Sequence, residues 1–535
     1  MTMKKLIILS ALLPCFVSCL SVKVGDSLPH DEIYSTPADV YRNAVAALYN
    51  NLGSNQESIG LQGTCRGIYD YNTLTTDEVI VPIRGGDWYD GGYWENLYFH
   101  TWESSDRCLY TVWTYLFSNI SRCNASLDVL ARSSELCGAE TTNAWIAEVR
   151  ALRAIFFWYA MDLFGNIPIV DEHNKWQELQ SPRSQTFRFI FNELQYSLEY
   201  LPIARSNEEG LHYGKVTAPV VWFVLAKLAL NAEIYSDDDC TDGIGQDGSA
   251  IMFEVEGSKL NAWETCIFYC DRLADIYGLE SMISSNFSTG NEKSLENIFT
   301  IPADRESYKV DYHYQFRSIH YSHGAAYGFE AENGPSATRK AMQVFGYGTP
   351  SPDPRLWATF SFDEVKVGGE PVLTEDGRPL VYYPMEVAPN LTDSPFKTTA
   401  GARFNKYETD IHAYENGKLQ DNDIVLFRFA DALLMKAEAL VRNGQDGTSS
   451  MACLRERAGA SPRECNLDTL LEERMLELAL EGWRRQDLIR FGKYHLEYDM
   501  RPQLPSETDA HTNLFPIPRK CIELNGKLKQ NKGYE

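Results

Sequence analysis

Long apolar stripes at helical spacing are the feature that most restricts how this 535-residue chain can fold. From Trp145 onward, apolar side chains return at steps of four and three residues, which places them on one face of a helix. The stripe continues through Val149, Leu152, Phe156, Tyr159 and Leu163. It stops at Gly165 and Pro168, residue types that are common at helix ends. The segment is therefore predicted to be an amphipathic helix whose apolar face needs a partner.

Four other segments carry comparable stripes. The predicted helices cover residues 184–201, 217–235, 426–440 and 469–491. Ser184 and Thr217 are the expected N-caps of the first two, and Thr469 with Glu472 has the T-x-x-E spacing of a capping box. Small residues such as Ala151 lie within the stripes and favour close packing of paired helices. No clean 34-residue period is present, so the residues alone predict a mainly α chain with repeat-like helix packing.

The helical periodicity fades between Ile301 and Tyr407. Short β-prone runs such as 380–383 alternate there with Gly-Pro, Gly-Gly and Pro-Asp turns. A loop-rich stretch of this length is usually functional. We therefore divide the chain into a signal segment, an N-terminal helical region with an aromatic loop at 84–102, a loop-rich segment that contributes to a ligand face, and a C-terminal helical region. Their predicted bounds are 1–18, 19–240, 241–420 and 421–535.

The N-terminus predicts where the protein is sent. Two lysines precede the apolar run Leu6–Val17, which is too short to span a bilayer and is typical of a secretory signal peptide. Ser18 then stands directly before Cys19, an arrangement that resembles a bacterial lipobox. Cleavage there leaves Cys19 as the N-terminus, and acylation of its thiol and amine anchors the body of the protein to a membrane. The alternative is ordinary cleavage beside an incidental cysteine.

The net charge restricts which ligands the protein can bind, and the cysteine spacing restricts its metal sites and disulfides. With 49 Lys+Arg against 74 Asp+Glu, the net charge of −25 disfavours nucleic acid and anionic lipid as ligands. Ten of the 12 cysteines remain after Cys15 leaves with the signal and Cys19 takes lipid. Their spacing is irregular, and Cys266 with Cys270 lacks the second pair of a zinc site. Most are expected to be buried, while one or two disulfides stay open as an alternative.

Motifs for cofactors and catalysis are weak or absent. Residues 243–248 match G-x-G-x-x-G, but they follow three aspartates and no strand precedes them, so a loop is predicted. A loosely held calcium ion at this loop is the alternative. His320 and His323 lack further metal-ligand partners, which favours surface or packing roles. No hydrolase, P-loop or kinase motif occurs, and we expect neither a cofactor nor catalytic residues.

One charged helix could nevertheless suggest acid–base chemistry. Glu472, Glu473, Glu477 and Glu481 lie along one predicted helix with arginines at 474, 484 and 485. Two such carboxylates could act on a glycoside. Because arginines are interleaved with them, a buried or half-buried ion-pair network is the preferred interpretation.

Aromatic residues make up 12 % of the chain and are concentrated in two places. The first is the stretch 87–102, which holds seven aromatic residues among turn residues. Tyr98, Phe99 and Trp102 lie near helical spacing and are expected in the core. The remaining rings stand beside Gly-Gly and Asp and are candidate ligand contacts: Trp88, Tyr89, Tyr93 and Trp94.

The second concentration lies between residues 308 and 327. Its candidate contacts are Tyr312, Tyr314 and Tyr321. Flanking polar candidates are Asp77, Arg84, Asn96 and Arg317. An apolar sugar face can lie on an aromatic ring while such groups hydrogen-bond the hydroxyls. The predicted ligand is therefore an oligosaccharide, with core packing as the alternative for each ring.

Several segments, in this order, resemble the SusD/RagB family of outer-membrane nutrient-binding lipoproteins. The matching stretches are Ala151-Leu152-Arg153-Ala154 with Leu163–Pro168, Asp353-Pro354-Arg355, Leu426–Ala439, Arg455–Gly459, Glu473-Arg474 with Glu477-Leu478 and Asp487-Leu488, and Phe515-Pro516-Ile517-Pro518. Gln486 and Lys532 depart from the family pattern, where an aromatic residue and a proline are usual.

The resemblance implies an α-helical fold with tetratricopeptide-type helix pairs and an irregular part that builds the binding face. It implies a protein anchored in the outer membrane through Cys19, facing outside, that passes captured oligosaccharide to a TonB-dependent transporter. The family has no catalytic residues. Its ligand contacts differ between members, so none is carried over. A peptide-binding importer of the same fold, a glycoside hydrolase and a pure assembly scaffold remain alternatives.

Overall fold

Helices dominate the protein, and its strands are short. The computed structural model describes residues 33–56, 58–173, 179–312 and 314–534. The predicted signal segment 1–18 and the lipidation site Cys19 lie outside these residues. Within them, the prediction of a mainly α fold with a loop-rich part is confirmed.

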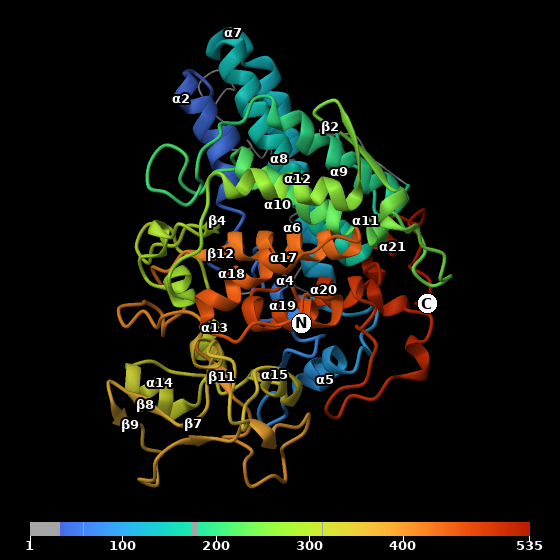
Figure 1. The fold of residues 1–535 in the computed structure, drawn as a ribbon. Helices are drawn as coiled ribbons and strands as arrows, with labels where there is room; N and C mark the ends of the chain where they lie inside the picture. The colour runs from blue at the N-terminus through green and yellow to red at the C-terminus, as the bar shows by residue number, and fades with distance from the viewer. Residues whose placement is uncertain (1–32, 57, 174–178, 313, 535) are drawn as a thin grey trace, which may run out of the picture.

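The longer helices pack in succession through the upper and middle parts of the view in Figure 1. They are α6 (Arg107–Arg132), α8 (Ala139–Phe164), α9 (Arg183–Leu198), α10 (Ala218–Leu230), α12 (Ala262–Ala274), α17 (Phe429–Arg442), α18 (Thr448–Ala458) and α19 (Leu467–Leu478). Helix α8 packs against α6 and α9, α10 against α9 and α12, and α17 against α12, α18 and α19. Such stacking of neighbouring helices is the helical-repeat packing that the sequence predicts.

Helix α8 is the predicted stripe-bearing helix, and it is more deeply buried than one apolar face requires. Between Ala147 and Phe164 every side chain except Arg150 is buried. Because α6 covers one side and α9 another, the helix is apolar nearly all round. Its central place explains why the sequence stripe is wide.

Two predicted helix starts are wrong. Pro182, not Ser184, is the N-cap of α9, and the Ser184 amide and hydroxyl bind the Asp238 carboxylate instead. Leu426 lies in strand β12 (Ile424–Arg428) directly before α17. All five residues of that strand are buried. A buried strand shows no alternation, so its apolar run extended the helical stripe of α17.

The helix predicted over 469–491 is two helices. Asn466 caps α19, with Thr469 rather than Glu472 as the returning partner of the capping box. The helix ends at Leu478, and Leu480 takes a left-handed φ of 68°. The Lys406 ammonium binds the carbonyl oxygens of Glu477 and Ala479, which the helix end leaves open. Helix α20 (Arg484–Arg490) then begins.

Short elements complete the fold. The short helices are α2 (Pro37–Val40), α3 (Ala47–Tyr49), α4 (Ile68–Thr73), α5 (Tyr93–Tyr98), α7 (Ser134–Cys137), α11 (Ala232–Tyr235), α13 (Tyr314–Ser318), α14 (Tyr321–Tyr327), α15 (Arg339–Val344), α16 (Leu356–Thr359) and α21 (Arg519–Leu524). The antiparallel strand pairs are β1 (Val79–Ile80) with β5 (Ser336–Ala337), β2 (Met252–Val255) with β3 (Ser258–Asn261), β4 (Asn297–Ile301) with β12, β6 (Phe360–Ser361) with β11 (Arg403–Phe404), β7 (Asp363–Glu364) with β10 (Val381–Tyr382), and β8 (Lys366–Val367) with β9 (Glu370–Pro371).

The loop-rich segment forms the lower part of the molecule in Figure 1, where α5, α14, β7, β8 and β9 are seen. Between residues 301 and 407 the helices have seven residues or fewer. The segment predicted at 241–420 is not uniform, because α12 and β4 pack into the helical part. The irregular lower part therefore begins after β4.

Candidate functional site

A strained turn in the aromatic loop presents one ring to solvent. Trp88 and Asp90 have φ values of 63° and 41°, and Gly91 and Gly92 continue the left-handed backbone into α5. A bulky residue in this region is uncommon and is held there by its surroundings. Tyr89, between the two strained residues, is 57 % exposed. The loop therefore fixes Tyr89 on the surface.

The segment around Glu332 and Gly334 holds the Trp88 side chain in place. Its indole Nε1 donates to the carbonyl oxygen of Glu332 at 3.0 Å. Its ring lies so close to Gly334 that a Cβ there would come within 2.4 Å of it. Glycine is needed at 334 because only a bare backbone leaves room for the ring.

The second aromatic segment meets this loop. The Tyr321 hydroxyl donates to Asp87 Oδ2 at 2.8 Å, and Tyr321 is 42 % exposed at the start of α14. The His320 side chain caps that helix by accepting from the Ser322 amide. We call Asp87, Trp88, Tyr89 and Tyr321 the Tyr89–Tyr321 face. It joins two segments that are more than 200 residues apart in the sequence.

Ion pairs and stacked cations support the face from below. Arg317 binds both oxygens of Asp70, at 2.7 and 2.9 Å, and its guanidinium lies 5.1 Å from the Trp94 ring. Arg66 covers Trp94 at 4.8 Å and pairs with Asp90 at 2.7 Å. Each guanidinium both neutralises a carboxylate and covers an aromatic ring. Trp94 is thus the buried centre on which the strained turn rests.

Two further arginines beneath the face are bound by oxygen atoms without a carboxylate. Arg84 donates to the carbonyls of Gly334, Lys397 and Ala400 and to the Ser336 hydroxyl. Arg403 shares that hydroxyl, and burial lowers the pKa of Arg403 to about 10.

The charge of these two arginines acts on the histidines of α14. Burial, with Arg403 and Arg84 nearby, lowers the pKa of His320 to about 4. Burial and the same Arg403 lower the pKa of His323 to about 4. Both imidazoles are therefore neutral at pH 7. His323 Nδ1 lies 3.0 Å from the Tyr382 hydroxyl, a packing role that agrees with the sequence interpretation.

Of the eleven candidate contacts, Arg317 is the buried partner of Asp70, and the other ten divide by exposure. Tyr89, Tyr321 and Asn96 are exposed, and Trp88 and Tyr93 are half-buried. The other five lie in the interior, where other side chains cover them: Asp77, Arg84, Trp94, Tyr312 and Tyr314. Ligand contact stays a prediction for all ten.

Each of the interior five has a structural partner. Asp77 is held by Arg484 at 2.7 and 2.8 Å. Tyr312 stacks on Tyr314 with ring centroids 5.4 Å apart. Aromatic clustering in the sequence thus arises as much from core packing as from surface display.

Tyr383 and Trp357 are among the exposed aromatic residues that sequence reasoning did not single out. Tyr383 follows β10, is 39 % exposed and packs on Phe396 with centroids 4.6 Å apart. Its signal was the alternating run 380–383, in which Tyr382 faces inward and Tyr383 outward. Trp357, in α16, is 55 % exposed, and the available signal was the run of turn residues at 350–354 with Phe360 and Phe362 after it.

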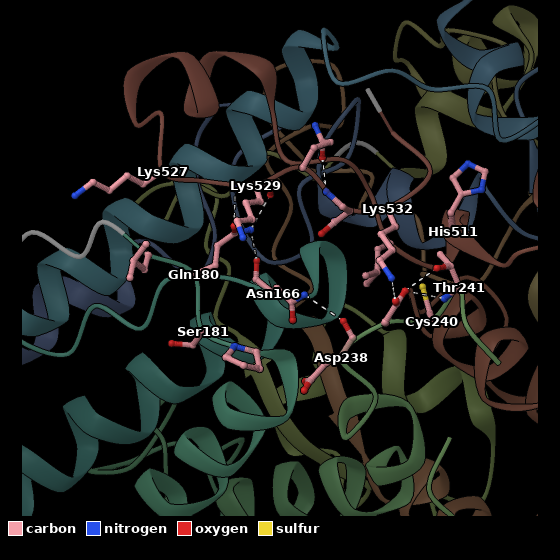
Figure 2. Close-up of a pocket in the computed structure, with 16 residues that line it drawn as sticks. Asn166, Gln180, Ser181, Asp238, Cys240, Thr241, His511, Lys527, Lys529 and Lys532 are labelled. Atoms are coloured by element: carbon pink, nitrogen blue, oxygen red, sulfur yellow. Dashed lines mark hydrogen bonds and ion pairs between the residues drawn. The ribbon is translucent and has the colours of Figure 1, made fainter. Parts of the chain in front are cut away.

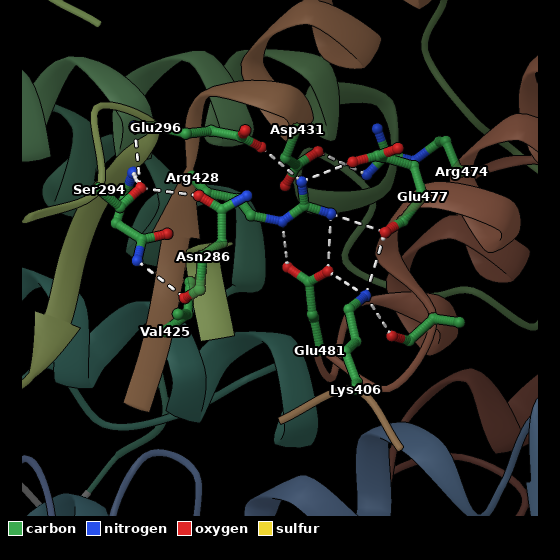
Figure 3. Close-up of polar contacts among 12 residues, drawn as sticks. Asn286, Ser294, Glu296, Lys406, Val425, Arg428, Asp431, Arg474, Glu477 and Glu481 are labelled. Atoms are coloured by element: carbon green, nitrogen blue, oxygen red, sulfur yellow. Dashed lines mark hydrogen bonds and ion pairs between the residues drawn. The ribbon is translucent and has the colours of Figure 1, made fainter. Parts of the chain in front are cut away.

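Two of the carboxylates considered for acid–base chemistry, Glu477 and Glu481, are buried in ion pairs (Figure 3). Arg428 binds Glu481 and Glu296 at 2.7 Å and Glu477 at 2.6 Å, and Lys406 also pairs with Glu481. We call Glu296, Lys406, Arg428, Glu477 and Glu481 the ion-pair core. The predicted network is confirmed for Glu477 and Glu481, whereas Glu472 is partly exposed beside Arg463.

A hollow of about 610 Å³ lies between the start of α9, the 238–241 loop and the C-terminal tail (Figure 2). Three lysines line it, at 527, 529 and 532. Its carboxylates are already used, because Asp238 binds Ser184 and Asp239 pairs with Lys532. It has no exposed aromatic ring among its lining residues. The hollow is therefore unlike the Tyr89–Tyr321 face.

The described residues contain no disulfide, no metal-binding cluster and no membrane-spanning helix. Their ten cysteines are free thiols. They contain no group of three or more His, Cys, Asp or Glu side chains arranged to hold a metal. The 243–248 segment is a loop, as predicted. None of the helices described has the length and hydropathy that crossing a bilayer requires.

The chain is similar to known proteins over most of its length. The family model described as the SusD family matches residues 349–534. The starch-binding protein SusD of Bacteroides thetaiotaomicron is 25 % identical over 518 residues, covering 89 % of this chain and 87 % of that protein. The SusD-like protein P38 of Formosa agariphila is 38 % identical over 132 residues, 22 % of this chain and 25 % of that protein.

Solved structures share the fold. Surface glycan-binding protein A from Bacteroides thetaiotaomicron superposes with a TM-score of 0.71 at 19 % identity, covering 94 % of this chain and 100 % of that one. The same protein in complex with laminarihexaose gives a TM-score of 0.69 at 20 % identity, covering 93 % and 100 %. The family model over residues 349–534, the relative that spans most of the chain and the shared architecture together support membership of the SusD/RagB family.

Proposed function

We infer that the protein captures oligosaccharide, with the Tyr89–Tyr321 face as its contact surface. The observation that carries this proposal is the 2.8 Å contact of Tyr321 with Asp87, which brings the two aromatic segments together on one surface. Exposed rings beside a carboxylate and a phenol suit a sugar, because the rings cover its apolar face while the polar groups bind its hydroxyls. Relatives named for binding starch and laminarin support the proposal.

The lipid anchor in this proposal follows from the Ser18-Cys19 sequence, and the outer membrane and the transporter follow from the resemblance to the SusD/RagB family. Cys19 carries lipid and tethers the protein to the outer membrane, facing outside. A TonB-dependent transporter in that membrane receives the captured oligosaccharide. The protein itself does not cleave the glycan, because the carboxylates that could act as acid and base are held in the ion-pair core.

The exposure of each side chain indicates how directly it would contact the sugar. Tyr89 and Tyr321 contact the sugar first, Trp88 and Tyr93 form the floor, and Asn96 hydrogen-bonds at the edge. The interior residues Asp77, Arg84, Trp94, Tyr312 and Tyr314 contribute by holding these rings in place.

A glycan array of the purified protein is the direct test. We expect one glycan class to bind, and Tyr89→Ala and Tyr321→Ala each to weaken that binding by about tenfold, roughly 1.4 kcal/mol. Tyr414→Ala is the matched control, since Tyr414 is 46 % exposed outside the face. Binding of peptides without any glycan would instead establish the peptide-importer alternative. Full affinity in the Tyr89→Ala/Tyr321→Ala variant would remove the face as the site.

A further inference from the structure

Trp357 stands apart from the other tryptophans that the structure describes. It is the single exposed one, with 55 % of its surface accessible. Its indole Nε1 has no hydrogen-bond partner among the described residues, whereas the corresponding atom of Trp88 donates to a carbonyl. A large ring with an open polar edge is costly to expose and is common at binding surfaces.

The backbone under Trp357 is held firmly. Arg355, two residues earlier, is buried and binds Asp353 and Glu473 at 2.8 Å and Glu477 at 3.0 Å. On the other side, the Asn405 side chain donates to the Trp357 carbonyl at 3.2 Å. Since the backbone is already ordered, a ligand that covers the ring meets a smaller entropic cost.

Polar and aromatic neighbours repeat the chemistry of the Tyr89–Tyr321 face. The Tyr347 hydroxyl donates to Asp363 Oδ1 at 2.7 Å, as Tyr321 donates to Asp87 at 2.8 Å. Phe362 lies between the two other rings, 6.1 Å from Trp357 and 5.5 Å from Tyr347. Asp363 and Asn405 are both exposed.

The surroundings favour a sugar over a protein partner. A stable protein interface buries about 1,200–2,000 Å² with an apolar centre. Here the chain next to the rings, residues 348–351, is exposed and consists of Gly, Thr, Pro and Ser. An exposed ring, an exposed carboxylate bound by the neighbouring Tyr347 and an exposed amide on the Trp357 carbonyl offer the kinds of group that bind a sugar unit.

We propose that Trp357, with Tyr347, Asp363 and Asn405, forms a second carbohydrate-binding surface, separate in sequence from the Tyr89–Tyr321 face. The proposal rests on the proposed function. Two surfaces on one protein retain a long polysaccharide more strongly than a short oligosaccharide, because binding at the second surface becomes intramolecular.

Affinity electrophoresis in gels that contain soluble starch, laminarin, xylan or mannan tests the proposal. We expect Trp357→Ala to weaken retention by the best of these polysaccharides by roughly fivefold to tenfold. Trp357→Phe keeps a ring and should retain most of the effect. Leu211→Ala, which removes a 75 % exposed side chain elsewhere, should change nothing.

Titration with a hexasaccharide of the same glycan separates the two surfaces. Tyr89→Ala/Tyr321→Ala should leave a weak binding event that disappears when Trp357→Ala is added. Unchanged retention of Trp357→Ala, with native binding intact, would overturn the second surface alone. If none of the four polysaccharides retains the native protein, the proposed function and this surface both fall.

Discussion

The ion-pair core and the Tyr89–Tyr321 face use the same kinds of side chain for opposite purposes. In the core, Arg428 satisfies three carboxylates, and all these groups are at least 95 % buried. At the face, Asp87 and Tyr321 pair on the surface, and their rings and carboxylates stay accessible. The core consumes its hydrogen-bonding capacity within the protein, whereas the face keeps part of it for a ligand.

This difference explains why the family motifs identify the fold more readily than the ligand. Glu477 and Arg355 lie in motif stretches and fix the packing of α19 against the 353–359 segment. Tyr89 and Tyr321 lie outside those stretches. Motifs whose residues form buried ion pairs keep the scaffold the same, whereas the ligand contacts outside them are free to differ.

The largest effect is expected from breaking the core. Glu477→Gln leaves Arg355, Arg428 and Arg457 without their shared carboxylate, so the free energy of unfolding should fall by about 3–5 kcal/mol. Urea denaturation measures the change. Glu472→Gln on the same helix is the control and should change stability by less than about 0.5 kcal/mol, because that pair is exposed. An equal, small effect of both substitutions would show that the network does not stabilise the fold.

The second comparison lies within the aromatic loop itself. Trp94→Ala removes a ring that is 1 % exposed, so it should cost about 3–5 kcal/mol of stability. Tyr89→Ala removes an exposed ring and should cost less than about 0.5 kcal/mol. Thermal unfolding checks both. If the order were reversed, Tyr89 would be a packing residue and the face would lose its proposed role.

Sequence patterns predicted the helical scaffold well because burial leaves a periodic trace. The 145–163 stripe identified α8, and arginines interleaved among the glutamates of 472–485 identified the buried network. The failures have local causes. Leu426 belongs to a strand buried on both faces, which has no alternation to detect. The break after Leu478 depends on the left-handed Leu480 and on Lys406, which lies about seventy residues away in the sequence.

The candidate site was predictable only in part. Composition located both aromatic segments, but it could not separate Tyr89 from Trp94, because exposure depends on the backbone turn and on Arg66 and Arg317. The contact between Asp87 and Tyr321 is long-range and has no sequence signal. Trp357 lies between turn residues at 350–354 and the aromatic residues Phe360 and Phe362, but the sequence alone does not show that its ring is exposed.

As the pH falls, the loop-rich segment around His320 and His323 should lose stability before the ion-pair core does. His320 and His323 have pKa values of about 4, below the unfolded value of about 6.5. Between these values the unfolded chain binds protons that the folded chain does not, so their contribution is full above pH 6.5 and declines as the pH falls towards 4. Asp431, drawn beside the ion-pair core in Figure 3, stays ionised, because Lys227 and Arg474 outweigh burial and lower its pKa to about 2.

From pH 7 to pH 5.5 we expect the two histidines together to lower the free energy of unfolding by about 2–3 kcal/mol. Urea denaturation at both pH values measures the loss. His323→Gln should remove about half of it, because glutamine does not titrate, whereas His412→Gln, at an exposed position, should not alter it. A loss that is the same in native protein and His323→Gln would contradict the assignment.

The smallest expected change in stability comes from removing the hydrogen bond between Tyr321 and Asp87, which connects the two aromatic segments. Tyr321→Phe keeps the ring and removes only the hydroxyl that donates to Asp87. Because this hydrogen bond is partly exposed, stability should fall by about 0.5–1 kcal/mol, and glycan affinity by less than about tenfold. Isothermal titration of Tyr321→Phe beside Tyr321→Ala separates the hydroxyl from the ring. If both variants lost affinity equally, the hydroxyl would be the sugar contact; if only Tyr321→Ala lost it, stacking on the ring would be the main contribution, as we expect for a face built on exposed aromatic rings.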